Sequence, residues 1–219
     1  MKEYEKTKLN RVKRGQNRAI YDVEKINTIL DAGFLCYVGY IYDGKPITIP
    51  MAYARRDDKI YIHGSTANRM LLSILKSEET SITVMHLDGL VLARSGLHHS
   101  VNYRSATLFG SLKKIEKDSD KSQILGWIVN QMMPNHWGSL RPMHQKELDR
   151  TLVVEFTIET ASAKIRDVGV NDEPEDYSLP IWAGVVPIKQ VAEYPVSDEK
   201  LIEGVSIPEH VLAYYQQNK

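Results

Sequence analysis

The sequence of 219 residues, 42% of them hydrophobic, is long enough for one ordinary globular domain with a real core. Its 28 Lys and Arg residues balance 28 Asp and Glu residues, which argues against nucleic-acid binding, because nucleic-acid-binding proteins usually carry a net positive field. The single cysteine, Cys36, excludes an intrachain disulfide and a cysteine-rich zinc site, and it indicates an intracellular protein.

Charge is unevenly distributed along the chain. Residues 1–25 hold eight Lys and Arg against four Asp and Glu, whereas residues 167–219 hold three against ten. The simpler interpretation is a solvated basic arm over residues 1–15 and an acidic region that includes a C-terminal extension over residues 190–219; partner binding is the alternative. The sequence has neither the apolar core of a secretory signal nor a membrane-spanning run, so we expect a cytoplasmic protein without a membrane partner.

Helical spacing of apolar residues predicts four helices. The first follows Asp22, a typical N-cap, and the second follows Ser65 and Thr66, either of which we expect to cap it. Pro134 ends the third. The predicted helices cover residues 22–31, 66–76, 119–133 and 144–149.

Runs rich in β-branched and aromatic residues predict the strands. Asp43-Gly44 is a strong hairpin signal, Asp57-Asp58 marks a second turn, and we expect a third turn at Asp88-Gly89. Residues 171–180 have loop composition, and residues 182–188 follow as a short extended segment. The predicted strands cover residues 34–42, 46–55, 59–63, 80–86, 90–93, 103–115 and 152–165.

This order of elements predicts a mainly β fold. About six consecutive strands with hairpin turns and a few flanking α-helices indicate an antiparallel barrel or sandwich rather than a parallel sheet. No strand is followed by Gly-x-Gly-x-x-Gly, and Gly-x-x-x-x-Gly-Lys-Ser/Thr is absent from the sequence. A nucleotide-like cofactor must therefore be held in another way.

Three segments carry groups that could bind a ligand. The first joins a strand to a helix: free backbone N–H groups at the helix start, the hydroxyl of Ser65, and Arg69 outline a phosphate site, which Gly64 would allow an anion to approach closely. An ordinary capped helix with an exposed arginine is the alternative. His63 directly precedes this segment.

The second segment is the strand around Pro50. Alternation places Ile47, Ile49, Met51 and Tyr53 on one face, but Pro50 cannot donate to a β-ladder, so this stretch should lie at an edge or a bulge. Unpaired backbone groups there could bind the polar edge of a flat heterocycle. A bulge that only curves the sheet explains the same pattern.

The third segment, residues 98–105, is too polar for a core strand. His98 and His99 invite a metal interpretation, which we disfavour because adjacent strand residues point to opposite faces and no carboxylate is near in sequence. We expect instead a polar binding surface with Asn102, Arg104 and Ser105 as donors. The sequence also lacks His-Glu-x-x-His and Gly-x-Ser-x-Gly, so zinc proteolysis and serine hydrolysis have no support.

Taken together, these segments resemble the pyridoxamine 5′-phosphate oxidase-related FMN-binding proteins, with nitroimidazole-resistance reductases as distant relatives. The resemblance extends from about residue 11 to residue 190. It rests on blocks that are specific in combination: Arg18-Ala19, residues 43–46, residues 49–53, residues 62–65, residues 99–105, residues 164–166 and residues 182–187.

The resemblance implies a split β-barrel that forms a homodimer and binds FMN at the subunit interface. It places Pro50, Met51 and Ala52 beside the isoalloxazine, and His63 and Gly64 near the ribityl chain. It also favours Ser65 and Arg69 as the phosphate site. Ile49, Asn102, Arg104, Ser105 and Trp182 complete the implied cofactor-binding set.

The function implied is an FMN-dependent oxidoreductase that transfers hydride or electrons between the flavin N5 and a small-molecule substrate. His63, His99 and Tyr103 are candidate proton donors, and no catalytic residue can be assigned among them. The substrate motifs of true pyridoxamine phosphate oxidases are absent, so vitamin B6 oxidation is not expected. A non-catalytic flavin-binding, storage or sensing module is the alternative, and a haem- or deazaflavin-binding barrel is a third.

Overall fold

The computed structural model describes residues 2–77 and 80–219, so Met1 of the predicted basic arm lies outside the described residues. Its sheet is antiparallel, with strand order β1-β7-β4-β3-β2-β5-β6. The additional pairing of β6 with β7 closes six of these strands into a ring, which confirms the predicted barrel. The strands are β1 (Ala19–Ile20), β2 (Leu35–Tyr42), β3 (Lys45–Arg56), β4 (Lys59–Ser65), β5 (Thr80–Leu92), β6 (Ser100–Lys114), β7 (Thr151–Arg166) and β8 (Gly184–Pro187).

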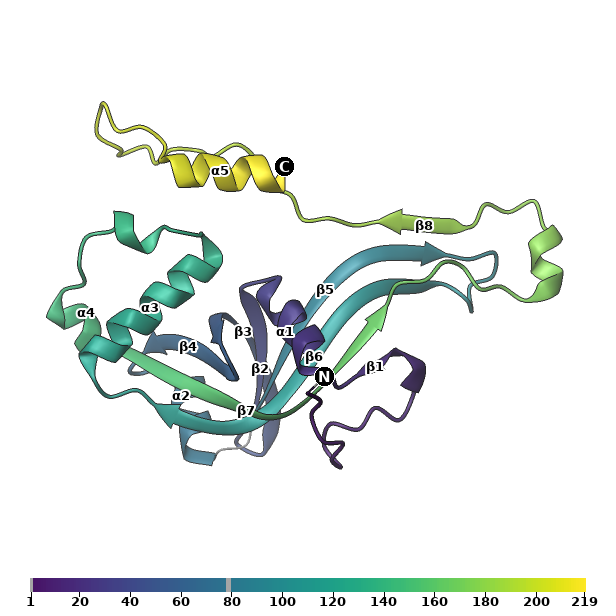
Figure 1. Ribbon diagram of the computed structural model, residues 1–219, viewed down its shortest axis with the longest axis horizontal. Helices are drawn as coiled ribbons and strands as arrows, with labels where there is room; N and C mark the ends of the chain where they lie inside the picture. Colours follow the sequence, from purple (N-terminus) through teal and green to yellow (C-terminus); the bar gives the residue numbers. More distant parts are fainter. Residues whose placement is uncertain (1, 78–79) are drawn as a thin grey trace.

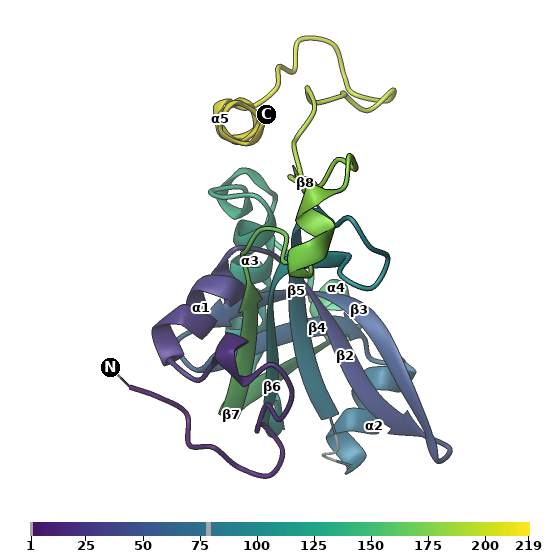
Figure 2. The ribbon, with the colours of Figure 1, turned by 90° about the vertical axis from the view of Figure 1, so that its right-hand side faces the viewer.

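The helices flank the barrel, as Figures 1 and 2 show. All four predicted helices are present, and the backbone N–H of Lys25 donates to Asp22 as the N-cap of α1. The predicted start of α2 is wrong: the helix begins at Arg69, and Asn68, not Ser65 or Thr66, accepts from the N–H of Leu71. The helices are α1 (Val23–Asp31), α2 (Arg69–Ser77), α3 (Asp118–Met132), α4 (Gln145–Asp149) and α5 (Glu209–Asn218), with 3₁₀ turns η1 (Gln16–Arg18), η2 (Trp137–Ser139) and η3 (Pro174–Ser178).

The two Asp-Gly pairs behave differently. Asp43 and Gly44 have φ values of 51° and 68°, as a two-residue hairpin turn requires, and they join β2 to β3 as predicted. The turn expected at Asp88-Gly89 is wrong, because β5 runs straight through it. The ladder with β6 only shifts register between Leu87 and Gly89, so the extra residue forms a β-bulge.

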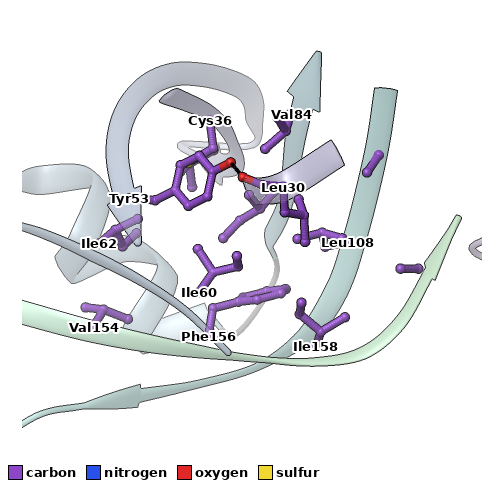
Figure 3. Packing of buried hydrophobic residues seen from close by; sticks show 14 of the residues in the cluster. Leu30, Cys36, Tyr53, Ile60, Ile62, Val84, Leu108, Val154, Phe156 and Ile158 are labelled. Atoms are coloured by element: carbon purple, nitrogen blue, oxygen red, sulfur yellow. Dashed lines mark hydrogen bonds between the residues drawn. The ribbon is translucent and has the colours of Figure 1, made fainter. Parts of the chain in front are cut away.

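The main core fills the barrel. Figure 3 shows Phe156 and Ile60 beneath Tyr53, whose hydroxyl donates to the carbonyl oxygen of Leu30 on α1. Cys36 is fully buried in the same cluster, and burial raises the pKa of its thiol to about 12. A second cluster joins Tyr61 and Ala54 of the sheet to α3 and α4.

The two ends of the chain differ in how they meet this barrel. The basic arm was expected to be solvated, but Asn10 is only 2% exposed and hydrogen-bonds to β7 through Thr160 and Ala161. The C-terminal extension, residues 190–219, follows β8 and ends in α5, which has no buried residue. In Figure 1 the extension lies apart from the sheet, above α3.

Candidate functional site

The predicted cofactor residues of β3 and β4 lie where these two neighbouring strands stop pairing, at a split in the barrel. Pairing of β3 with β4 runs from Arg56↔Lys59 to Tyr53↔Ile62 and ends there. Continued in register, it would pair Ala52 with His63, Met51 with Gly64 and Pro50 with Ser65. Among the described residues no such pairs form, so this part of β3 pairs with β2 alone. Pro50 therefore lies on an edge, as predicted.

Side chains at the split point in two directions. Ile49 and Met51 are partly buried and pack against the main core, so they offer a ligand mainly backbone groups. Pro50 is exposed, and Ala52 packs against the second cluster. The ligand-facing surface of β3 is therefore small and flat, which suits contact with a planar ring.

His63 is the titratable group nearest to this split. Its side chain is partly buried, and Nδ1 is buried without a hydrogen-bond partner in the described part of the chain. Burial lowers the pKa of the imidazole, because a charged ring would be poorly solvated there. A buried polar atom without a partner costs free energy, so His63 is suited to a polar ligand.

The start of α2 adds the groups predicted to bind phosphate. Ser65 accepts from the N–H of Ala67 at 3.2 Å, and the Arg69 guanidinium lies 4.5 Å from the ring centroid of Tyr42. A Cβ on Gly64 would come within 3.0 Å of Asn68 and 3.1 Å of Leu71. Gly64 therefore allows α2 to pack closely against β4, a role that sequence alone did not suggest.

Asn102 and Arg104 lie on a different part of the sheet, and their polar groups are engaged within the chain. Asn102 is 5% exposed, and its carbonyl oxygen accepts from Arg166 at 2.5 Å. The Arg104 guanidinium makes two 2.9 Å bonds to Asp88, the carboxylate at the β5 bulge. Both residues therefore stabilise the long end of the β5–β6 hairpin, and the importance of Asp88 was missed from sequence because Asp-Gly resembled a turn.

The remaining predicted residues are also distant in the fold from the split. Trp182 is 67% exposed and precedes β8, which pairs with the far end of β5. His99 is exposed, with Nδ1 2.9 Å from the carbonyl oxygen of Ser95, and Tyr103 pairs with Arg166. Figure 1 shows β8 and β4 on opposite sides of the molecule, so one chain does not bring these residues to His63.

The outer face of the sheet carries an apolar strip that sequence reasoning missed. Leu35 and Tyr37 on β2 are 54% and 45% exposed, and Met85 and Leu87 on β5 are 49% and 42% exposed. Alternation of residues along β2 and β5 was the available signal, but it does not say which face is the core. Within residues 2–77 and 80–219, no group of three His, Cys, Asp or Glu residues could hold a metal, and no helix is long and apolar enough to cross a membrane.

A closed six-stranded antiparallel barrel in which two neighbouring strands separate is a split β-barrel. The family model described as pyridoxamine 5′-phosphate oxidase matches residues 22–165. The chain belongs to this family.

Similar solved structures cover most of the chain. The flavocytochrome Anf3 from Azotobacter vinelandii is 37% identical, with a TM-score of 0.90 over 95% of this chain and 97% of that one. The FAD and heme binding protein from Mycobacterium smegmatis is 31% identical, with a TM-score of 0.84 over 90% and 97% of the two chains. A protein assigned to 5-nitroimidazole antibiotic resistance, from Bacteroides thetaiotaomicron, shares the fold at 20% identity and a TM-score of 0.58, over 67% and 86%. No curated protein matches the chain.

Proposed function

We propose that the protein is a flavin-binding oxidoreductase that holds its flavin at the split between β3 and β4. The observation that carries this proposal is the end of the β3–β4 ladder: residues 50–52 and 63–65 continue the two strands without pairing with each other, and they include a histidine whose Nδ1 has no partner among the described residues. Family membership and the two relatives above 30% identity support a flavin as the ligand.

The residues at the split fit a flavin. The edge of β3 offers backbone groups and the flat surface of Pro50, and the start of α2 offers Arg69 and free N–H groups to a phosphate. A bound flavin supplies hydride or single-electron transfer at N5. Because burial lowers its pKa, His63 is held neutral near pH 7 and can hydrogen-bond to a ligand or relay a proton.

The identity of the flavin and a second cofactor are further parts of the proposal. FMN is the prediction from the family, whereas the name of the Mycobacterium smegmatis relative supports FAD accompanied by haem, and that of Anf3 supports a flavocytochrome. If haem binds as well, His63, whose buried Nδ1 has no partner in the described chain, is our candidate for its ligand in place of the flavin contact proposed above. A flavin spectrum with Soret absorbance in purified protein, and loss of the Soret band in His63→Ala, would support a flavocytochrome.

We also propose a homodimer with the cofactor at its interface. In one chain, the predicted residues form two separate groups, near β3–β4 and near the far end of β5–β6, which a second copy could bring together. The apolar strip on β2 and β5 offers a contact surface. So does the C-terminal extension, in which Val196 and Ile202 are 95% and 74% exposed.

The experiment begins with the spectrum and mass of the ligand that copurifies. Added flavin at about 100 times its dissociation constant should stabilise the fold by about 2.7 kcal/mol. Arg69→Ala should weaken FMN binding more than tenfold, because a charged hydrogen bond contributes about 1.5–3 kcal/mol. Lys76→Ala, in the last turn of the same helix, is the matched control. Equal affinities in the two variants would place the phosphate elsewhere, and no flavin binding at all would refute the proposed function.

Turnover separates the oxidoreductase from a passive flavin module. Saturable reduction of quinones or nitroaromatics by NADH or NADPH would exclude the storage or sensing alternative. Tight flavin binding without turnover across such a panel would favour that alternative.

A further inference from the structure

The basic arm is fixed in place by hydrogen bonds rather than free in solvent. The side-chain nitrogen of Asn10 lies 2.6 Å from Thr160 Oγ1, 3.0 Å from the carbonyl oxygen of Ala161 and 2.8 Å from that of Glu5. Two residues later, the N–H of Val12 donates to the hydroxyl of Tyr21 at 2.9 Å. Figure 2 shows the arm passing in front of β6 and β7. Residues 11–14 therefore have a defined position over the sheet.

A cavity of about 380 Å³ lies between this arm and the sheet. It is lined by four cationic side chains, those of Arg11, Lys13, Arg14 and Lys164. Three hydroxyl side chains form its floor, those of Ser105, Thr107 and Ser162. No Asp or Glu is among the described residues that line it. These cationic and hydroxyl side chains can donate the hydrogen bonds that anions need.

Strand register explains why the hydroxyl groups converge. Ser105 pairs with Lys164 and Thr107 pairs with Ser162, and residues directly opposite in an antiparallel ladder share a face. Thr107 also lies 3.3 Å, oxygen to oxygen, from Thr83 on β5, which continues the row toward the apolar strip. The cavity is therefore on the same outer face of the sheet as that strip. The structure places Ser105 here and not beside His63.

The positive charge of this cavity is not neutralised by the chain. In residues 2–77 and 80–219, no carboxylate forms an ion pair with Arg11, Lys13, Arg14 or Lys164, whereas Arg55, Arg94, Arg104 and Arg141 each have one. Lys164 reaches only the carbonyl oxygen of Arg14, at 3.4 Å. Close by on β7, burial and then the charge of Arg18 lower the pKa of Arg166. Unpaired cations held together by the fold repel one another unless an anion joins them.

We propose that this cavity binds the phosphate or diphosphate group of a nucleotide. Arginine forks and lysine ammonium groups make charge-assisted bonds to phosphate oxygens, and the three hydroxyls supply further donors. The nucleotide rests on the proposed flavin function, whereas anion binding by the cavity does not depend on it. The group could belong to FAD itself or to a separate nicotinamide nucleotide that reduces the flavin.

Inorganic pyrophosphate is the direct probe of the cavity. Titration calorimetry on the full chain should show saturable binding that weakens as salt is added. The double variant Arg11→Ala/Arg14→Ala should bind pyrophosphate at least tenfold more weakly, because it loses two charged donors. Ser162→Ala removes a hydroxyl from the floor without altering the arm, and should weaken binding severalfold. Lys8→Ala removes an exposed cation of the same arm that is outside the cavity, and should change nothing.

The source of the phosphate follows from affinities for whole nucleotides. If the group belongs to FAD, the double variant loses FAD affinity at least tenfold and keeps FMN affinity, and pyrophosphate competes with FAD. If it belongs to a separate reductant, both flavins bind as before and NADP⁺ or NAD⁺ affinity falls. If the double variant loses pyrophosphate affinity but binds FAD, FMN, NAD⁺ and NADP⁺ as the wild type does, the nucleotide assignment is overturned. Equal pyrophosphate binding by the double variant and Lys8→Ala, or no binding by the wild type, would overturn the site, even if flavin binding at the split is intact.

Discussion

The barrel and the C-terminal extension differ in how they are stabilised. In the barrel, side chains such as Tyr53, Ile60 and Phe156 have no solvent exposure. In the extension, Val196 and Ile202 are mostly exposed, and α5 contacts the rest of the chain through the 2.9 Å bond between His210 and His136. The barrel contains its own core, whereas within the described residues the extension has no fully buried apolar side chain. This difference supports the proposed dimer, in which a second molecule would cover the extension.

The largest expected effect comes from the barrel core. Phe156→Ala should lower the free energy of unfolding by about 3–5 kcal/mol, because it leaves a large cavity in a fully packed cluster. Ile202→Ala in the extension should change the free energy of unfolding of the monomer by no more than about 0.5 kcal/mol. Urea denaturation at low protein concentration measures both. Similar losses in the two variants would refute the contrast between the regions.

Residues 167–183, between β7 and β8, contain a buried ion pair that lies outside the barrel. The Asp172 side chain is fully buried and accepts from the Arg94 guanidinium at 2.9 Å. Asp172→Asn leaves Arg94 without its counter-charge, which should cost about 3–5 kcal/mol locally. We expect faster proteolysis within residues 167–183 while the barrel melts at the wild-type temperature. Glu173→Gln, at a carboxylate 60% exposed, is the matched control and should leave proteolysis unchanged.

The extension itself can be tested through self-association. Ile202→Asp and Val196→Asp place a charge on side chains that the proposed dimer would bury, so each should weaken self-association more than tenfold. Analytical ultracentrifugation over a concentration series gives the dissociation constant. Leu72→Asp, on the half-exposed outer surface of α2, should leave it unchanged. An unaltered dimer in both extension variants would show that the extension is not part of the interface.

The smallest expected effect is a pH dependence at the split. Burial lowers the pKa of His63 in the folded state, so the unfolded chain binds a proton more readily. The contribution of His63 to the free energy of unfolding is complete above the ordinary pKa of about 6.5. It is lost as the pH falls from about 6.5 through the lower pKa that His63 has in the folded protein. His63→Gln should flatten the acid side of the stability profile in the protein free of cofactor. His99→Gln, at an exposed position, should keep the wild-type slope.

Local sequence signals were sufficient for most of the elements. A two-residue hairpin turn needs φ above zero at both central residues, and Asp-Gly tolerates this conformation. Asp43 and Gly44 both adopt it, so this turn could be predicted from the two residues alone. The predicted edge at Pro50 is confirmed because a missing N–H is a property of the residue itself. The turn predicted at Asp88-Gly89 is wrong because the backbone conformation there depends on β6 and β8, which pair along both sides of β5 and keep it extended.

Composition, alternation and turn chemistry thus determined an antiparallel six-stranded barrel with flanking helices, since these signals act between neighbouring residues. Only the tertiary structure decided which strands separate, that Asn102 and Arg104 are engaged within the chain, and that the basic arm lies over Ser105 and Lys164. Each of these depends on contacts between residues distant in sequence, such as Asn10 with Thr160. The balanced charge of the chain gave no sign of the cationic cavity, because net charge sums over the molecule and a site depends on where the charges lie.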